Sequence, residues 1–361
     1  MRRLRPLLVP LAAVGGIGLL LAALLLAGGR DPALALAALW SGAFGSADAV
    51  LSATLVRATP LIMAGLAVAL AFRAGILNIG AEGQLLAGAG AGAAVGIIAG
   101  PALGPLAAPL VLVAGAALGA AWAGVAAVLR RRGVPEVIST LMLNFVALHA
   151  VGWLVRGPLQ EPSRVYPQSV PLPDAARLPI LVPGTRLHAG IVVALVAAAA
   201  LWFGLRHTAA GFRVRASGAS PDAARSAGRI DVARTTAGVF LVSGALAGLA
   251  GAGEVAGVTY ALYENLSPGY GYTAIAVALL ARLDPRWVVP SGLLFGALEA
   301  GAGAMQRDAG VPASVVDVAE ALLILLVLAL GAGQLAGSWR ANGPVTTRAP
   351  EAGSGRPEAA D

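Results

Sequence analysis

The chain has 361 residues, of which 58% are hydrophobic and only 12% are charged, and its mean hydropathy is +0.81. This composition excludes an ordinary soluble domain and predicts an all-α polytopic membrane protein. The net charge is +7, all 25 basic residues are arginine, and cysteine is absent. Because a P-loop requires lysine, any ATP that drives this protein must be bound by another subunit, and we expect neither a cofactor nor a metal on this chain.

Apolar runs divide the chain into about ten predicted membrane spans, followed by a disordered tail. The tail, 338–361, is rich in Pro, Gly and Ala, and 1–337 form the transmembrane domain. The eighth span has only about 11 apolar residues, so it either begins earlier, near Tyr270, or is a broken or re-entrant helix. Pro101 and Pro105 are expected to separate the third and fourth spans. The spans are expected at 7–28, 51–72, 81–100, 106–129, 136–155, 187–205, 235–258, 273–283, 287–305 and 315–333.

Arginine distribution predicts that both termini lie in the cytoplasm. Three arginines precede the first span, and on this topology 18 arginines fall on the cytoplasmic side and seven outside. Segment 157–186, with seven prolines, is then the longest outer loop. Segment 206–234 is a basic cytoplasmic connection. Within it Pro221, Asp222 and Ala223 predict the start of a short amphipathic helix with an acid in its first turn.

The segment 72–84, FRAGILNIGAEGQ, places polar residues and glycines between two predicted spans. Polar groups at membrane depth are costly unless they face a partner or a cavity, so an intramembrane polar cluster indicates a functional site. The alternative is a tight polar turn in the cytosol, and spacing alone does not separate the two. A similar glycine-rich sequence surrounds Glu254, which suggests inverted repeats relating spans 2–5 to spans 7–10.

Four blocks of sequence resemble a known family. They are RATPLIMAGLAVALAFRAGILNIGAEGQLLAGA at 57–89, VPEVISTLMLNFVAL at 134–148, GFRVRASGASPDAARSAGRI at 211–230 and YGYTAIAVALLARLDP at 270–285. In this order they resemble the permease subunits of ATP-binding-cassette importers in the branched-chain amino acid, ribose and nucleoside branch. The wording NIGAEGQ is most similar to nucleoside and simple-sugar permeases. The resemblance covers about 53–330.

This resemblance implies a transport subunit that is not itself an enzyme. It would form the translocation pathway for a nucleoside or a related simple sugar. An extracytoplasmic binding lipoprotein would deliver the solute, a cytoplasmic ATPase subunit would supply the energy, and a second permease, either a copy or a paralogue, would complete the pore. The location implied is the bacterial cell membrane. Such a subunit would transport nothing on its own.

The resemblance also implies two sets of functional residues. Nucleosides and sugars are bound by amides and carboxylates with aromatic stacking. A lone buried asparagine such as Asn144 is more often an interhelical hydrogen-bonding residue than a ligand. Ser220 and Ser226 depart from the Asn and the aromatic residue usual in the coupling segment. The pathway candidates are Phe72, Asn78, Glu82, Gln84, Asn144, Phe145 and Glu254, and the ATPase-coupling candidates are Arg213, Arg215, Gly218, Pro221, Asp222, Ala223, Ala224, Arg225 and Gly228.

Two other classes of protein are weighed against the permease subunit. A self-sufficient secondary transporter would use Glu82, Glu254 or Glu299 to carry a coupling proton. An intramembrane enzyme is disfavoured, because the chain has no Cys, only three His, and neither an H-E-x-x-H nor a G-x-S-x-G motif.

Overall fold

The computed structural model describes residues 5–228, 230–312, 314–319 and 321–322. Within these residues the backbone forms helices, loops and three isolated β-bridges, which confirms the predicted all-α class. The α-helices are α1 (Arg5–Ala27), α2 (Pro32–Phe44), α3 (Leu55–Arg73), α4 (Ala81–Leu103), α5 (Ala107–Arg131), α6 (Glu136–Arg156), α7 (Gly190–His207), α8 (Ala209–Ala219), α9 (Pro221–Gly228), α10 (Val232–Glu254), α11 (Tyr270–Leu280) and α12 (Pro285–Ala309). A π-helical segment, Ala49–Thr54, precedes α3, and another, Val255–Thr259, follows α10.

Six segments of the described chain are long and apolar enough to cross a membrane. One of them, Ala81–Arg131, contains both α4 and α5. The predicted eighth span is the short helix α11, which starts at Tyr270 and has 11 residues. Of the predicted tenth span only 315–319 and 321–322 are described, and these are helical. The tail at 338–361 lies outside the described residues.

Helix starts coincide with the capping residues that the sequence offers. Thr208, Asp231 and Asp284 each accept a hydrogen bond from a backbone N–H in the first turn of α8, α10 and α12. Such caps satisfy donors that have no partner inside the helix. Pro285 adds a preset φ at the first position of α12.

One boundary differs from the sequence prediction, and one helix was not predicted. Pro101 lies inside α4 and does not end it; the helix continues to Leu103, and the chain reverses at Gly104, whose φ is +52°. A proline removes one hydrogen bond but does not by itself stop a helix, whereas a left-handed φ does. The helix predicted to start at Pro221 is α9, and a further short helix, α8, which was not predicted, precedes it. They are separated at Ser220, which is extended because the residue before a proline avoids the helical region.

The centre of the bundle is built from α3, α4, α5 and α10. In the apolar stretch that includes α3, 83% of the residues are buried, whereas in α7 only 28% are, so α7 is peripheral. Glycines let α4, α5 and α10 approach closely: a side chain at Gly248 would overlap the backbone of Gly115, and one at Gly88 would overlap Gly248. The glycine-rich sequence before Glu254 thus allows α10 to pack closely against α4 and α5.

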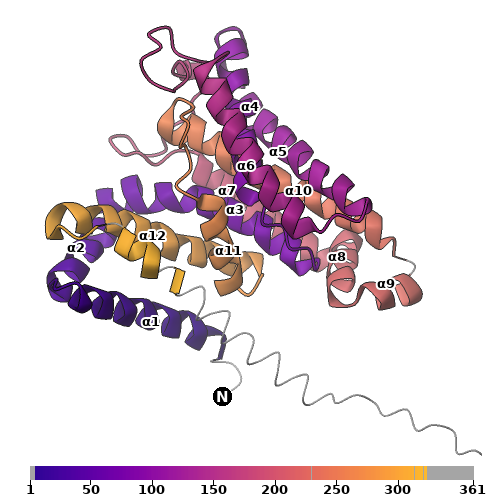
Figure 1. Ribbon diagram of the computed structural model, residues 1–361, viewed down its shortest axis with the longest axis horizontal. Helices are drawn as coiled ribbons and strands as arrows, with labels where there is room; N and C mark the ends of the chain where they lie inside the picture. Colours follow the sequence, from indigo (N-terminus) through magenta and orange to yellow (C-terminus); the bar gives the residue numbers. More distant parts are fainter. Residues whose placement is uncertain (1–4, 229, 313, 320, 323–361) are drawn as a thin grey trace, which may run out of the picture.

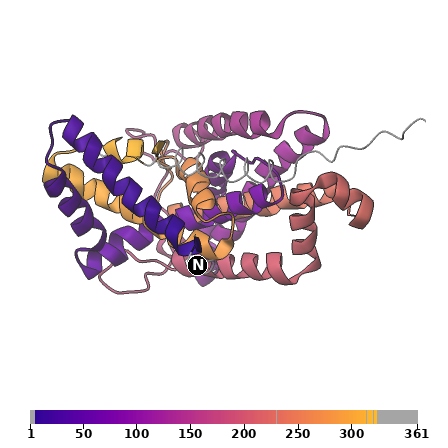
Figure 2. The same cartoon turned by 90° about the horizontal axis from the view of Figure 1, so that it is seen from below.

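Helices α8 and α9 project from one end of the molecule, beyond the ends of α7 and α10 (Figures 1 and 2). At the other end, α1 and α2 lie beside α12 (Figures 1 and 2). Helix α3 runs between the two groups and contacts both α12 and α8 (Figure 1). This arrangement leaves the projecting pair accessible.

Candidate translocation site and coupling segment

The polar residues between α3 and α4 lie inside the protein. Asn78, Gln84 and Glu82 are 0%, 1% and 7% exposed. The side chains of a polar turn in the cytosol would be open to water. These three are buried instead, so their polar groups need hydrogen-bond partners inside the protein. We call this set of residues, Asn78–Gln84 with the side chains that bind them, the polar junction.

Asn78 uses its whole amide within the protein. Its Nδ2 donates to Gln84 Oε1 at 3.1 Å and to Ser243 Oγ at 3.0 Å. Its Oδ1 accepts from Gly80 N and from Gln84 Nε2, each at 3.0 Å. Ser243 in turn donates to the carbonyl of Ala67 at 2.8 Å. Ser243 lies about 17 Å along α10 from its start, so the junction is level with the middle of that helix.

Asn144 on α6 ties two further helices to the same place. Its Oδ1 accepts from Gly83 N at 2.8 Å, and its Nδ2 donates to the carbonyl of Ile79 at 3.0 Å and to the hydroxyl of Tyr272 at 3.3 Å. Asn144 therefore has the interhelical hydrogen-bonding role that the sequence analysis weighed against solute binding. Five helices, α3, α4, α6, α10 and α11, therefore meet at the polar junction.

Glu82 lies where the N-terminal ends of α4 and α11 meet. Its carboxylate accepts from Gly271 N at 2.7 Å, and Ser267 lies beside it. A side chain at Gly271 would overlap the backbone of Glu82, so only glycine allows this approach. Each N-terminus carries a partial positive charge, which a carboxylate between them offsets. Two helices that start at one point and run apart are the geometry expected of inverted repeats. The repeats themselves stay a prediction.

A second group of charges surrounds Glu254 at the end of α10. Glu254 is buried, and the charges within electrostatic reach of it are Glu299, Arg57 and Arg186. Arg57 Nη1 lies 3.8 Å from Glu299 Oε2. Tyr270, also buried, is within reach of both Glu82 and Glu254. The polar junction and the Glu254 group are thus electrostatic neighbours.

The two phenylalanine candidates lie apart from these groups. Phe72 is half-buried and packs on the core near the end of α3. Phe145 is 50% exposed, on a different face of α6 from its neighbour Asn144. Among the predicted pathway residues, the structure brings Asn78, Glu82, Gln84 and Asn144 together, with Glu254 nearby and the two aromatic rings outside.

The predicted coupling residues separate into an outward and an inward set. Arg213, Pro221, Asp222, Ala223 and Arg225 are exposed, and Arg225 Nη1 lies 2.7 Å from Asp222 Oδ1. The inward set comprises Arg215, Gly218 and Ala224. Ala224 packs with Ile230 and Val232, which holds α9 against the start of α10. Gly228 is the last residue of α9.

Gly218 on α8 contacts the end of α3 directly. A side chain there would overlap the carbonyl oxygen of Arg73 and crowd Ala74. On the other side of the contact Gly75 has a φ of +74° and faces Gly218. This contact, the α8–α3 contact, is three residues along the chain from Asn78. It connects the projecting helices to the polar junction.

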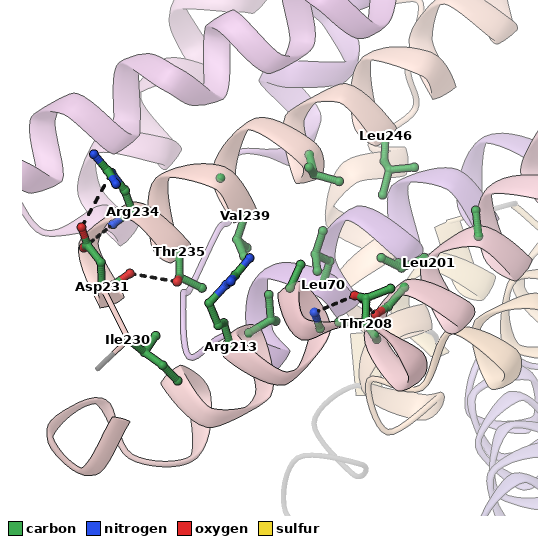
Figure 3. Close-up of a pocket in the computed structure, with 18 of the residues that line it drawn as sticks. Leu70, Leu201, Thr208, Arg213, Ile230, Asp231, Arg234, Thr235, Val239 and Leu246 are labelled. Carbon is green, nitrogen blue, oxygen red and sulfur yellow. Dashed lines mark hydrogen bonds and ion pairs between the residues drawn. The ribbon is translucent and has the colours of Figure 1, made fainter. Parts of the chain in front are cut away.

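A groove of about 910 Å³ runs between α7, α8 and α10 (Figure 3). Its end near α8 is polar, with Arg213, Thr208 and Thr235, and its far end is apolar, with Leu201 and Leu246 (Figure 3). Asp231, which caps α10, binds Arg234 N at 2.9 Å on the rim. The groove separates α7 from α10 down to their shared connection, α8 and α9.

Comparison with known proteins decides the family. Residues 50–330 match the family described as branched-chain amino acid transport system, permease component. The chain belongs to this permease family. The guanosine ABC transporter permease protein NupP of Bacillus subtilis is 41% identical over 90% of this chain and 94% of its own length. The glucose ABC transporter permease protein TsgB13 of Haloferax volcanii is 41% identical over 77% and 76%. The nucleoside ABC transporter permease protein NupB of Lactococcus lactis is 32% identical over 90% and 91%. No solved structure gives a significant match.

Family membership makes the permease a multi-pass membrane protein and a transport component. It supports the importer subunit over the self-sufficient, proton-coupled transporter, because these relatives are named as ABC transporter permeases. A permease of this kind works with an ATPase and a binding protein in general. Family membership alone leaves the specific partners and the solute open.

Several residues of the polar junction were not singled out from the sequence. Ser243 lies in an apolar, glycine-rich helix where a lone serine gives no signal. Tyr272 and Gly271 fall within the block 270–285, and the family resemblance of that block was the only indication in the sequence that they matter. Ser267 precedes the helix start at Tyr270, in a segment rich in Tyr and Gly.

Proposed function

We propose that this chain is the membrane subunit of an ATP-driven nucleoside importer. The relatives named for guanosine and for nucleosides match it over nearly its whole length, whereas the relative named for glucose matches about three quarters of it. Glucose, as a simple sugar, is the competing solute. The amides and carboxylate of the polar junction suit either, since both present hydroxyl groups.

The polar junction is the closed gate of the pathway in this proposal. The observation that carries it is the meeting of two helix N-termini on the Glu82 carboxylate. Asn78, Gln84 and Asn144 spend their hydrogen bonds on one another and on the backbone, so a solute reaches them only when α4 and α11 separate. The released amides and N–H groups would then bind the hydroxyls of the solute. Glu254 would line the pathway on one side of the junction, and Phe72, near the α8 end of α3, would lie on the other side.

The driving subunit docks on the exposed face of α9 in this proposal. Pro221, Asp222, Ala223 and Arg225 supply that face, and Arg213 flanks it. Movement of α8 and α9 would pass through the α8–α3 contact to the polar junction. ATP is bound by the docked subunit in the cytoplasm, so α8 and α9 lie on the cytoplasmic side in this proposal, and the arginine distribution assigns both termini to the same side.

Two further partners complete the importer. A binding lipoprotein delivers the solute to the loop 157–186 on the outer side. A second permease packs on the exposed apolar face of α6, where Met142, Phe145 and Trp153 are each about half exposed or more. Phe145 would reach the pathway at that subunit interface.

Reconstituted uptake tests the proposal. The chain, its ATPase, the second permease and the binding protein are placed in vesicles, and ATP-driven uptake of labelled guanosine is measured with and without excess glucose. We expect uptake that glucose does not inhibit, and none from the chain alone. Concentrative uptake by the chain alone, or uptake of glucose only, would contradict it.

Substitution at the junction makes the test specific. Glu82→Ala should abolish uptake while the subunits still assemble, because the offset of the two N-termini is lost. Glu264→Gln is the matched control: this glutamate forms a partly exposed ion pair with Arg156, outside the junction, and uptake should persist. Normal uptake by Glu82→Ala would make the junction a purely structural element.

A further inference from the structure

A basic pocket lies beside the coupling segment, between the ends of α3 and α7, α8 and the start of α12. Its volume is about 290 Å³. Four arginines and one aspartate contribute ionisable side chains to its lining, so its walls carry an excess of positive charge. The lining includes Arg73, Arg206, Arg215, Arg286, Asp284 and Trp202.

Some of these groups are already paired, and others are not. Asp284 is bound by Arg286, with Nη2 at 2.8 Å and Nε at 3.2 Å, and Arg73 Nη1 donates to the carbonyl of Leu283 at 3.0 Å. By contrast, Arg215 Nη1 and Trp202 Nε1 are buried donors without an acceptor among the described residues. Buried donors normally have a partner, so this pocket offers two donors and an exposed arginine, Arg206, to an anion.

The depth of the pocket matches that of lipid headgroups. Helix α7 has 18 residues, the length of an apolar segment that just crosses the hydrocarbon core. Trp202 and Arg206 lie in its last two turns, next to the projecting α8. Tryptophan and arginine at a helix end mark the boundary between the membrane and water.

An apolar face of α7 leads from the membrane to this pocket. Val192, Leu195 and Ala199 precede Trp202 and Arg206 at alternating spacings of three and four residues, which places all five on one side of the helix. Val192 and Leu195 are 47% and 46% exposed. One surface therefore offers an anion site at its end and an apolar track beside it.

We propose that this pocket binds the phosphate of an anionic phospholipid, with an acyl chain along the Val192–Leu195–Ala199 face of α7. A carboxylate from a docked protein subunit would need the anion site but not the apolar track, and the pocket lies at the membrane end of the coupling segment, whereas α9 projects away from it. The bound phosphate joins α3, α7, α8 and α12. The lipid thereby holds the base of the coupling segment next to the α8–α3 contact.

Lipid binding to the full chain tests this proposal independently of transport. The chain is purified in a neutral detergent, and binding of phosphatidylglycerol and phosphatidylcholine is measured by native mass spectrometry. We expect phosphatidylglycerol to bind more tightly. Arg215→Gln should weaken its binding about tenfold, the loss expected for one charge-assisted hydrogen bond. Arg132→Gln, which changes an exposed arginine at the same end of the molecule, should leave it unchanged within about twofold.

A second variant covers the case in which Arg215→Gln does not fold. Trp202→Phe keeps an aromatic side chain but replaces the indole and so removes its N–H donor, and it should weaken phosphatidylglycerol binding several-fold. Equal affinity of the wild type and both variants would overturn the proposal. So would displacement of the lipid by millimolar inorganic phosphate, which would show a site for the free ion. Loss of ATPase binding by Arg215→Gln with unchanged lipid affinity would assign the pocket to the ATPase instead.

Discussion

The polar junction and the coupling segment look alike in the sequence, because both place polar residues between apolar runs. In the structure they differ: the polar residues of the junction are buried, and those of α9 are exposed. In the junction, Asn78 and Asn144 have their amide groups fully hydrogen-bonded to residues of α4, α10 and α11 and to the backbone before α4. In α9, Asp222 and Arg225 bind each other on an exposed surface. The α8–α3 contact joins the two regions.

The contrast teaches how to separate gating residues from docking residues. Buried polar groups with internal partners make a region rigid and costly to rearrange. Exposed ones cost little and are free to bind a partner. In the proposed mechanism a power stroke delivered at α9 would reach the junction through contacts of α8 such as the one that Gly218 makes with the end of α3.

The largest expected effect comes from breaking the junction. Asn78→Ala leaves Gly80 N, the Gln84 amide and Ser243 without their partner, and we expect a loss of stability of about 2 kcal/mol. Thermal unfolding of the detergent-purified chain measures it. Leu77→Ala changes the adjacent residue, which is 49% exposed, and should have a far smaller effect. Equal unfolding temperatures for wild type and Asn78→Ala would show that the hydrogen bonds of Asn78 do not stabilise the fold.

The next effect sharpens the comparison from the coupling side. Ala223→Arg places a long charged side chain on the exposed face of α9, so binding of the ATPase subunit should fall about tenfold or more, while the unfolding temperature stays the same. Ala175→Arg, at an exposed alanine of the outer loop, is the control. Unchanged ATPase affinity in Ala223→Arg would exclude this face as the docking site.

A smaller effect is expected at the exposed ion pair of α9. Asp222→Asn removes the partner of Arg225, yet exposed pairs contribute at most about 1 kcal/mol, so stability should barely change. The rate of ATPase association should instead respond, with a weaker dependence on salt. Marked unfolding of this variant would show that α9 is more firmly packed than its exposure indicates.

The smallest effect concerns pH at the turn before α12. Hydrogen bonds from Arg286 hold the pKa of Asp284 below its usual value of 3.8. A depressed carboxyl pKa stabilises the fold above the unfolded pKa, and that contribution is lost as the pH falls through the folded pKa. Asp284→Asn still caps the helix, so its stability should fall less than that of the wild type between neutral pH and pH about 3. An equal fall in both would show that this pair contributes nothing.

The sequence was sufficient for the helices and for one kind of site. Apolar periodicity and prolines located the long helices within a few residues, and Pro221 predicted the start of α9. The family resemblance, carried by motifs such as NIGAEGQ, was enough to predict a permease subunit. Asn78, Glu82, Gln84 and Asn144 were named together as candidates, and they lie together.

The sequence could not show the partners of those residues. Ser243 lies 165 residues beyond Asn78, and Gly271 lies 189 residues beyond Glu82, so only the folded chain brings them into contact. Nor could composition show that Arg215 and Gly218 face inward while Arg213 and Asp222 face outward. Burial depends on which neighbours a helix meets, and α8 meets the end of α3.

Transport efficiency in a Gly218→Ala variant tests the central claim most directly. The added methyl group would push α8 away from the carbonyl of Arg73, whereas Gly238→Ala on α10 adds the same group into open space. In vesicles holding the complete importer, we predict that Gly218→Ala still supports ATP hydrolysis but imports far less solute per ATP, while Gly238→Ala imports as the wild type does. An unchanged ratio of solute imported to ATP hydrolysed in Gly218→Ala would show that the power stroke does not pass through the α8–α3 contact.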